Sequence, residues 1–70
     1  MFTWFRRGDD YLRYEAREIS RGVYELTILR SDGSESIERF SDEQALNDRQ
    51  VALQQDLENQ GWTGPHGWNL

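Results

Sequence analysis

Apolar and polar positions alternate along two neighbouring segments of the chain. Within Tyr11–Ile19, apolar residues alternate with polar ones from Leu12 to Arg17, and the same alternation returns within Val23–Arg30, a segment rich in β-branched and aromatic residues. A period of two is typical of a strand with one buried face. The residues expected on that face are Leu12, Tyr14 and Ala16 in the first strand and Tyr24, Leu26 and Ile28 in the second.

The segment Ser20-Arg21-Gly22 separates the two strands. It fits a three-residue hairpin loop in which the glycine takes the left-handed conformation that a side chain would strain. Because a slip of one residue would turn one apolar set towards water, the loop and the alternation support the same register. The expected cross-strand pairs are Ile19 with Val23, Ala16 with Leu26, Tyr14 with Ile28 and Leu12 with Arg30.

A second turn is expected at Ser31-Asp32-Gly33-Ser34, because Asp-Gly at its centre is typical of a two-residue type I′ hairpin. This turn pairs Ile28 with Ile37 and begins a third strand from Glu35 to Phe40. Ile37 then joins the apolar face, whereas Glu38 lies on the solvent side. The sequence therefore predicts a three-stranded meander.

The segment Ser41-Asp42-Glu43-Gln44 is typical of a helix N-terminus, since a serine cap and the glutamine that follows it can form a reciprocal capping box. Neither glycine nor proline interrupts the chain from Asp42 to Gln60, and Gly61 supplies the stop. A helix over this segment is about 28 Å long, enough to lie across a small sheet. Its apolar stripe consists of Leu46, Leu53 and Leu57.

Aromatic residues precede two arginines at the N-terminus, an order that does not suit a signal peptide. Gly8-Asp9-Asp10 can turn the chain, so Met1–Phe5 is a candidate fourth strand beside the first one. Phe2 and Trp4 would then share a face and could join Trp62 in an aromatic end of the core. No apolar run approaches the ~20 residues that span a bilayer, and we expect a cytoplasmic protein without membrane contact.

The expected fold class is α+β: an antiparallel meander of three strands, or four with the N-terminal one, and one C-terminal helix packed across one face. With 70 residues the chain has material for one hydrophobic core, so residues 1–70 are expected to form a single domain. Its parts are the β-meander at residues 11–40, the helix at residues 42–60 and an aromatic C-terminal tail at residues 61–70.

The chain has no cysteine and a single histidine, and 13 acidic residues outweigh 8 arginines to give a net charge of -5. Without cysteine, disulfide bonds, cysteine-based zinc sites and thiol nucleophiles are excluded. A lone histidine supplies neither a metal site nor a nucleophile with its base, so we expect no metal and no cofactor. The acidic balance disfavours nucleic acid as a partner, because phosphate backbones require a basic surface.

The C-terminal residues 61–68 combine two tryptophans, the single histidine, the single proline and three glycines. On one interpretation, Trp62 and Trp68 fold back over the end of the core and the glycines supply turns. On the other, the tail forms an aromatic pocket or a partner-binding peptide, with His66 as a polar group between the rings. The sequence alone leaves both interpretations open.

The sheet face that points away from the helix is expected to mix opposite charges with aromatic residues. Arg17 pairs with Glu25 across strands in the predicted register, and Arg13 and Phe40 lie on the same face. Such a face is either solvated or a recognition surface, where arginine and aromatic residues are enriched. A small domain with an exposed edge strand also gains from association, so the expected partner is another protein or a second copy of the chain, as a homodimer.

Three features of the chain underlie a resemblance to other proteins: the meander with its Asp32-Gly33 turn, the leucine helix and the segment Gly61-Trp62-Thr63-Gly64-Pro65-His66-Gly67-Trp68. The chain resembles small bacterial proteins of uncharacterised function, of the kind chosen as structural genomics targets. This resemblance spans most of the chain and implies no reaction, ligand or catalytic residue. In shape, a sheet with one helix is also similar to single-strand DNA binders of the transcriptional coactivator type, whose basic face is missing here.

The leading hypothesis from the sequence is a non-enzymatic protein-interaction module or accessory subunit. The candidate partner- or ligand-binding residues are Trp62, His66, Trp68, Arg13, Arg17 and Phe40. A second hypothesis is a small-ligand binder or an enzyme that uses His66 with the two tail tryptophans. A third is single-stranded nucleic-acid binding through Arg13, Arg17 and aromatic residues, which the acidic charge disfavours.

Overall fold

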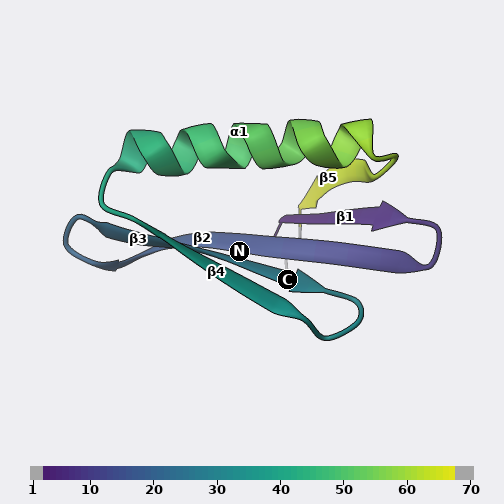
Figure 1. Ribbon diagram of the computed structural model, residues 1–70, viewed down its shortest axis with the longest axis horizontal. Helices are drawn as coiled ribbons and strands as arrows, with labels where there is room; N and C mark the ends of the chain where they lie inside the picture. Colours follow the sequence, from purple (N-terminus) through teal and green to yellow (C-terminus); the bar gives the residue numbers. More distant parts are fainter. Residues whose placement is uncertain (1–2, 68–70) are drawn as a thin grey trace.

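A single helix lies along one face of an antiparallel sheet in the computed structural model, which describes residues 3–67 (Figure 1). The elements are β1 (Thr3–Arg7), β2 (Asp10–Ser20), β3 (Val23–Arg30), β4 (Glu35–Phe40), α1 (Glu43–Asn59) and β5 (Thr63–Gly67). The strands lie in the order β4-β3-β2-β1-β5. The α+β class and the helix across one face are confirmed, whereas the expected three or four strands become five.

The β2–β3 hairpin follows the predicted register over most of its length. The confirmed pairs are Ala16 with Leu26, Tyr14 with Ile28 and Leu12 with Arg30. Near the turn, Ser20 rather than Ile19 lies opposite Val23. The expected three-residue loop is replaced by a tighter turn at Arg21-Gly22, because a β-bulge takes up Ile19. The glycine keeps the left-handed conformation, with a φ of 75°.

Between β3 and β4, the chain reverses through a three-residue loop, Ser31-Asp32-Gly33. The predicted hairpin has a loop of two residues, Asp32-Gly33. The N–H of Arg30 donates to the carbonyl oxygen of Ser34 at 3.0 Å, and the N–H of Gly33 donates to that of Arg30 at 3.0 Å. Gly33 has a φ of 88°, the left-handed conformation that ends a three-residue hairpin loop. The N–H of Ser34 donates to Asp32 at 2.8 Å, and this hydrogen bond lowers the pKa of the Asp32 carboxyl.

This longer loop shifts the register of β4 by one residue and turns its side chains over. Ile28 lies opposite Ser36, so the predicted pair of Ile28 with Ile37 is wrong. Ile37 is 54% exposed on the face away from α1 instead of joining the core. Glu38, expected on the solvent side, faces α1 and bonds to it. Phe40, expected on the outer face, packs against the core.

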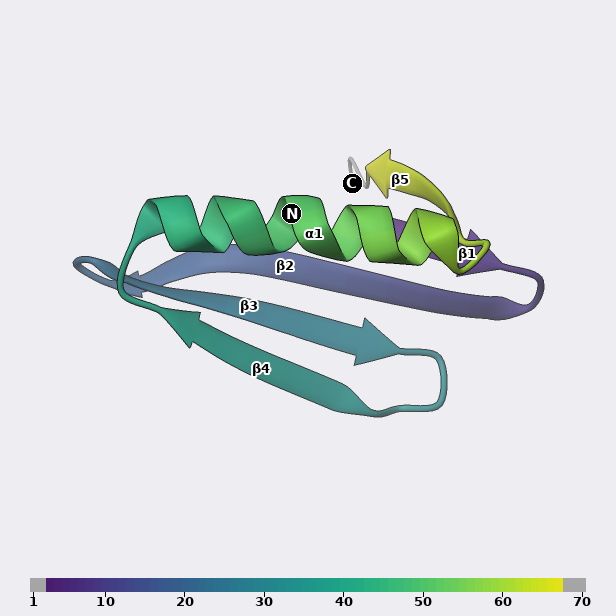
Figure 2. The same cartoon turned by 45° about the horizontal axis from the view of Figure 1, so that its top comes forward.

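The core lies between α1 and one face of the sheet, as predicted. Figures 1 and 2 show α1 running along β2 and β3, while no described element covers the opposite face of the sheet. The buried hydrophobic residues are Phe5, Leu12, Tyr14, Leu26, Ile28, Leu46, Leu53 and Leu57. The amide of Gln54 donates to the hydroxyl of Tyr14 at 2.6 Å, so the polar end of this buried ring has a partner.

The two ends of α1 are set by side-chain capping and by a glycine. Asp42, rather than the predicted Ser41, is the N-cap, and its carboxylate accepts the N–H of Gln44 at 3.0 Å. The Gln44 side chain donates to Asp48 at 2.9 Å, so it does not close the predicted capping box. Aspartate caps a helix as well as serine does, and the helix begins one residue later than expected. Gly61 follows the helix with a φ of 90° and acts as the expected stop.

A strand is present near the N-terminus, and β1 pairs with β2 over its whole length. Its alternation buries Phe5 completely and places Trp4 on the uncovered face. Trp4 therefore does not join Trp62, which packs against the core on the other side of the sheet. Phe2, the other aromatic residue expected in this strand, lies outside the described residues.

Strand β5 is not predicted by the sequence, because its glycines and its proline are poor strand formers. It occupies the edge of the sheet beside β1, where the missing N–H of Pro65 can face outwards. Gly64 lies against the buried ring of Phe5: a Cβ atom at Gly64 would be 2.7 Å from Cδ2 of that ring. The tail therefore closes over the end of the core, and its glycine makes the close approach possible.

We expect Gly64→Ala to lower the free energy of unfolding by about 2 to 4 kcal/mol. The new methyl group would overlap the Phe5 ring, and a φ of 148° is strained for alanine. Denaturant unfolding followed by tryptophan fluorescence measures the loss. Gly8→Ala is the control, because Gly8 has a φ of 60° with nothing within 4 Å of an added Cβ, so it reports backbone strain alone. Equal losses in both variants would contradict the packing role of Gly64.

Candidate functional site

The face of the sheet opposite α1 gathers half of the arginines of the chain. The strand registers place Arg6, Arg13, Arg17 and Arg39 on this face, out of 8 arginines in total. The exposed acids on α1 are Glu43, Asp48, Asp56 and Glu58. The uncovered face also carries Glu15, Glu25 and Glu35, so its four arginines exceed its glutamates by one.

A groove of about 580 Å³ lies on the uncovered face. Its apolar surfaces come from Trp4 of β1 and Leu29 of β3, which lie on either side of Arg13 in the register. The ring of Trp4 packs against His66 of β5, with ring centroids 4.5 Å apart and planes 32° apart. The full lining is Trp4, Tyr11, Arg13, Leu29, Arg30, Ser31 and Gly33. We call this the Trp4 groove.

Further along the uncovered face, four residues from Leu29 on β3, three charged residues form a row across the sheet. Glu25 is buried between Arg17 and Arg39, which lie opposite it on the two neighbouring strands. The carboxylate is 3.7 Å from a terminal nitrogen of Arg17 and 3.2 Å from Nε of Arg39. The predicted Arg17–Glu25 pair is therefore present. One carboxylate between two guanidinium groups leaves one excess positive charge on the surface.

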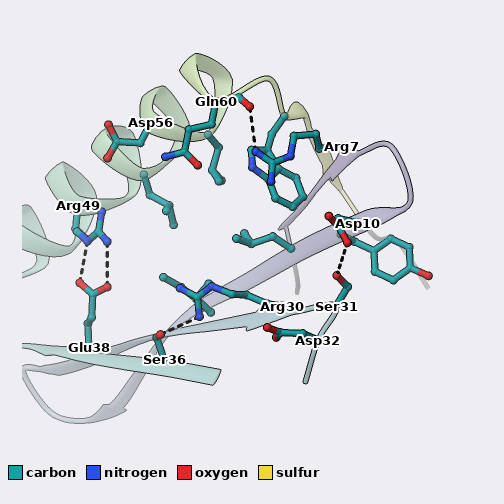
Figure 3. Close-up of a pocket in the computed structure, with 16 residues that line it drawn as sticks. Arg7, Asp10, Arg30, Ser31, Asp32, Ser36, Glu38, Arg49, Asp56 and Gln60 are labelled. Carbon is teal, nitrogen blue, oxygen red and sulfur yellow. Dashed lines mark hydrogen bonds and ion pairs between the residues drawn. The ribbon is translucent and has the colours of Figure 1, made fainter. Parts of the chain in front are cut away.

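A second groove of about 510 Å³ lies on the helix side, where the C-terminal half of α1 passes over the sheet (Figure 3). Core side chains, including Leu12 and Leu53, lie at its base. Its polar groups bond to one another: Arg49 to Glu38 at 2.8 and 3.1 Å, Arg30 to Ser36 at 3.0 Å, Arg7 to Gln60 at 3.1 Å and Ser31 to Asp10 at 3.2 Å. These bonds stabilise the rim of the core.

The pair of Arg49 and Glu38 shows how this rim is built. Two parallel N–H groups of the guanidinium donate to the two carboxylate oxygens, the strong bidentate arrangement (Figure 3). The hydrogen bonds from Arg49 to Glu38 raise the pKa of the guanidinium above its ordinary value. The pair connects α1 to β4, and it exists because the register of β4 turns Glu38 towards the helix.

Two of the candidate residues from the sequence serve the core. Trp62 is half-buried against the end of the core, and the guanidinium of Arg7 lies 4.6 Å from the centre of its ring. This arrangement agrees with the interpretation in which Trp62 folds back over the core. Phe40 packs on the same side of the sheet, which contradicts its predicted place on the outer face. Trp68 lies outside the described residues.

The structure brings the other candidates to the uncovered face. Arg13 lines the Trp4 groove, Arg17 belongs to the row around Glu25, and His66 supports the ring of Trp4. Sequence reasoning did not single out Trp4 or Leu29 as binding residues. The signal for Trp4 is its place next to Phe5 in an alternating segment, because burial of one of the two rings sends the other to the opposite face.

Comparison of the chain with known protein families, with curated proteins and with solved structures finds no match. Within residues 3–67, no group of three or more histidine and acidic side chains is placed to hold a metal ion. Nor does the described part of the chain contain a helix with the length and apolar character needed to cross a membrane.

We expect Glu25→Gln to lower the free energy of unfolding by about 1 kcal/mol, because the change leaves Arg17 and Arg39 facing each other without a carboxylate. Urea unfolding at low salt and at high salt measures the loss, which salt should reduce. Glu58→Gln, on the exposed surface of α1, is the matched control and should change stability by less than about 0.5 kcal/mol. Identical effects of the two substitutions would show that the charged row is not a stabilising unit.

Proposed function

We propose that the chain is a non-enzymatic protein-binding module whose uncovered sheet face holds an acidic segment of a partner protein. The observation that supports this proposal most directly is the Trp4 groove, where Trp4 and Leu29 lie beside Arg13 and Arg30. Tryptophan and arginine are the residue types that contribute most to binding energy at protein interfaces. An apolar side chain of the partner would occupy the groove, and neighbouring carboxylates would meet the arginines.

The apolar part of this recognition rests on a ring that is already held in place. Contact with the tilted ring of His66 restricts the indole of Trp4 before any partner arrives. A side chain that is ordered in the free protein loses little entropy on binding, so more of the contact energy appears as affinity. Leu29 is half-buried and offers a second apolar contact across the groove.

The arginines of the uncovered face favour a partner whose polar groups are carboxylates. A guanidinium binds a carboxylate through two parallel hydrogen bonds, which gives both strength and orientation. Beyond Arg13, the row around Glu25 adds Arg17 to the positive groups of the same face, with 60% of its side chain exposed. A short acidic segment can therefore meet arginines at the groove and further along the sheet.

A protein segment suits this face better than a nucleic acid does. Glu15, Glu25 and Glu35 lie among the arginines of the uncovered face, and the chain carries a net charge of -5. A continuous phosphate backbone would be repelled by these carboxylates. A peptide can place its few carboxylates next to the guanidinium groups alone, so its charges need not approach the glutamates.

The hypothesis of one pocket built from the tail residues has less support. Trp62 packs against the core on the helix side, whereas the ring of His66 contacts Trp4 on the uncovered face. The two residues therefore lie on opposite sides of the sheet. Their separate contacts account for each of them without a shared ligand.

The test uses fluorescently labelled peptides and anisotropy. A peptide of alternating glutamate and leucine should bind the intact chain, and its counterpart with lysine in place of glutamate should not. Arg13→Glu and Leu29→Asp should each weaken binding of the acidic peptide at least about tenfold. Arg21→Glu, at the tip of the β2–β3 turn, is the control with the same charge change and should bind as the unaltered chain does.

Other outcomes of this experiment would overturn the proposal. Equal binding of both peptides would show that the arginines do not select the partner. Binding of labelled oligothymidylate in preference to the acidic peptide would favour the nucleic-acid hypothesis. Unchanged affinity in Arg13→Glu and Leu29→Asp would place the binding surface elsewhere.

A further inference from the structure

The two edges of the sheet differ in their ability to accept another strand. β5 forms one edge, and it contains Pro65, which has no N–H to donate, and an irregular register with β1. β4 forms the other edge, and Glu35–Phe40 pairs with β3 without any irregularity. Proline, bulges and charged side chains protect sheet edges. β4 has neither proline nor a bulge, and its charged residues Glu35 and Arg39 are of opposite sign, so they do not repel a second copy of the strand. Its free side is therefore open to strand addition.

We propose that two copies of the chain associate by antiparallel pairing of their β4 strands about a two-fold axis at Ile37. This surface is separate from the Trp4 groove, so the inference does not depend on the proposed function. The pairing would join the two sheets edge to edge into one continuous sheet, with five strands from each copy.

The backbone of β4 has its free hydrogen-bonding groups where this pairing needs them. Arg30 and Ser34 form a hydrogen-bonded pair, with Arg30 N–H donating to the Ser34 carbonyl at 3.0 Å. Hydrogen-bonded and non-bonded pairs alternate along an antiparallel ladder. The alternation directs the N–H and C=O groups of Glu35, Ile37 and Arg39 away from β3, towards the open edge.

The side chains of these outward-directed residues complement their own copies. Residues that lie opposite each other in an antiparallel pair share a face of the sheet. With the axis at Ile37, the two isoleucines face each other, and Glu35 of each copy lies opposite Arg39 of the other. The central contact is apolar, and an attractive charge pair lies on each side of it.

Neighbouring registers lack this complementarity. An axis at Glu38 places the two Glu38 carboxylates opposite each other and sets Ile37 against Arg39. An axis at Ser36 sets Ile37 against Glu35 and leaves Arg39 beyond the partner strand. Like charges directly opposite each other destabilise a sheet, and opposite charges stabilise it. The register centred on Ile37 is therefore the one that the side chains select.

The residues that this register needs are accessible in the single chain. Ile37 is 54% exposed, although it is the only aliphatic residue in β4. The side chain of Arg39 is 72% exposed and uses its Nε atom towards Glu25, so its terminal nitrogens can reach the second copy. Ile37 is thus an exposed aliphatic residue between opposite charges on an edge strand.

The dimer would have a defined arrangement of its two surfaces. A two-fold axis at an edge-to-edge strand pair stands perpendicular to the sheet, so equivalent faces of the two copies lie on the same side. Both helices would then lie on one side and both Trp4 grooves on the other. A partner with two acidic segments could bind both grooves at once and gain affinity from the second contact.

The test takes advantage of the absence of cysteine from the chain. Ile37→Cys places a thiol at the proposed axis, where opposed Cα atoms in a hydrogen-bonded pair are about 5.5 Å apart, within disulfide reach. Mild oxidation at low protein concentration should link this variant into a dimer. Val51→Cys, on the exposed side of α1, is the control: Val51 is 56% exposed and Ile37 54%, and the control should stay largely monomeric.

Analytical ultracentrifugation of the unlinked chain gives the second measurement. The unaltered chain should dimerise reversibly as its concentration rises, and Glu35→Arg should weaken the dimer at least about tenfold, because it sets arginine against Arg39 on both sides of the axis. Glu58→Arg, with the same charge change on α1, should leave the association unchanged. Circular dichroism shows whether each variant is folded.

Three results would overturn the dimer. The unaltered chain could stay monomeric at high concentration, Ile37→Cys and Val51→Cys could crosslink equally, or Glu35→Arg and Glu58→Arg could associate alike. Failure of the peptide-binding test leaves these measurements unaffected, since none of the substituted residues lines the Trp4 groove. The two proposals can therefore fail separately.

Discussion

Burial of the leucine stripe of α1 against one face of the sheet is the interaction on which the rest of the structure depends. Leu46, Leu53 and Leu57 supply all of the buried residues that α1 contributes to the core. Each buried leucine stabilises the fold by about 1.5 to 3 kcal/mol, and a domain of this length has little stability beyond its core. A single helix can cover only one face, so the same interaction leaves the other face of the sheet uncovered by any described element.

The sequence predicted the β2–β3 pairing and the helix because independent signals agreed there. Alternation, the glycine turn and the leucine spacing all supported one arrangement. In β4 the signals conflict: Ile37 and Phe40 lie on opposite faces of any strand, so only one of them can reach the core. The Asp32-Gly33 dipeptide suits a two-residue turn, but the same glycine also ends the three-residue loop that is formed. Local patterns could not decide between these registers.

Tertiary contacts decide what the local patterns left open. In the observed register, Phe40 packs against the core and Glu38 binds Arg49 of the helix. The alternation in β4 and the leucine spacing in α1 describe each segment separately, so neither pattern predicts a contact between them. Strand β5 has the same origin, because its pairing with β1 and the approach of Gly64 to Phe5 outweigh the weak strand propensity of the tail. The Trp4 groove could not be predicted either, since it depends on the register of three strands at once.

The chain contains eight arginines and no lysine, and three contacts in the structure depend on the shape of the guanidinium group. Arg49 binds both oxygens of Glu38, the Arg7 guanidinium lies over the ring of Trp62, and Arg39 donates through Nε to Glu25. A lysine has neither a planar face nor a fork of donors, so it could make none of these three contacts in the same way. Arg49 and Arg7 lie on the core side of the sheet, at the edge of the core, whereas Arg39 lies on the uncovered face. Where guanidinium groups lie on the uncovered face, the same chemistry is available to the carboxylates of a partner.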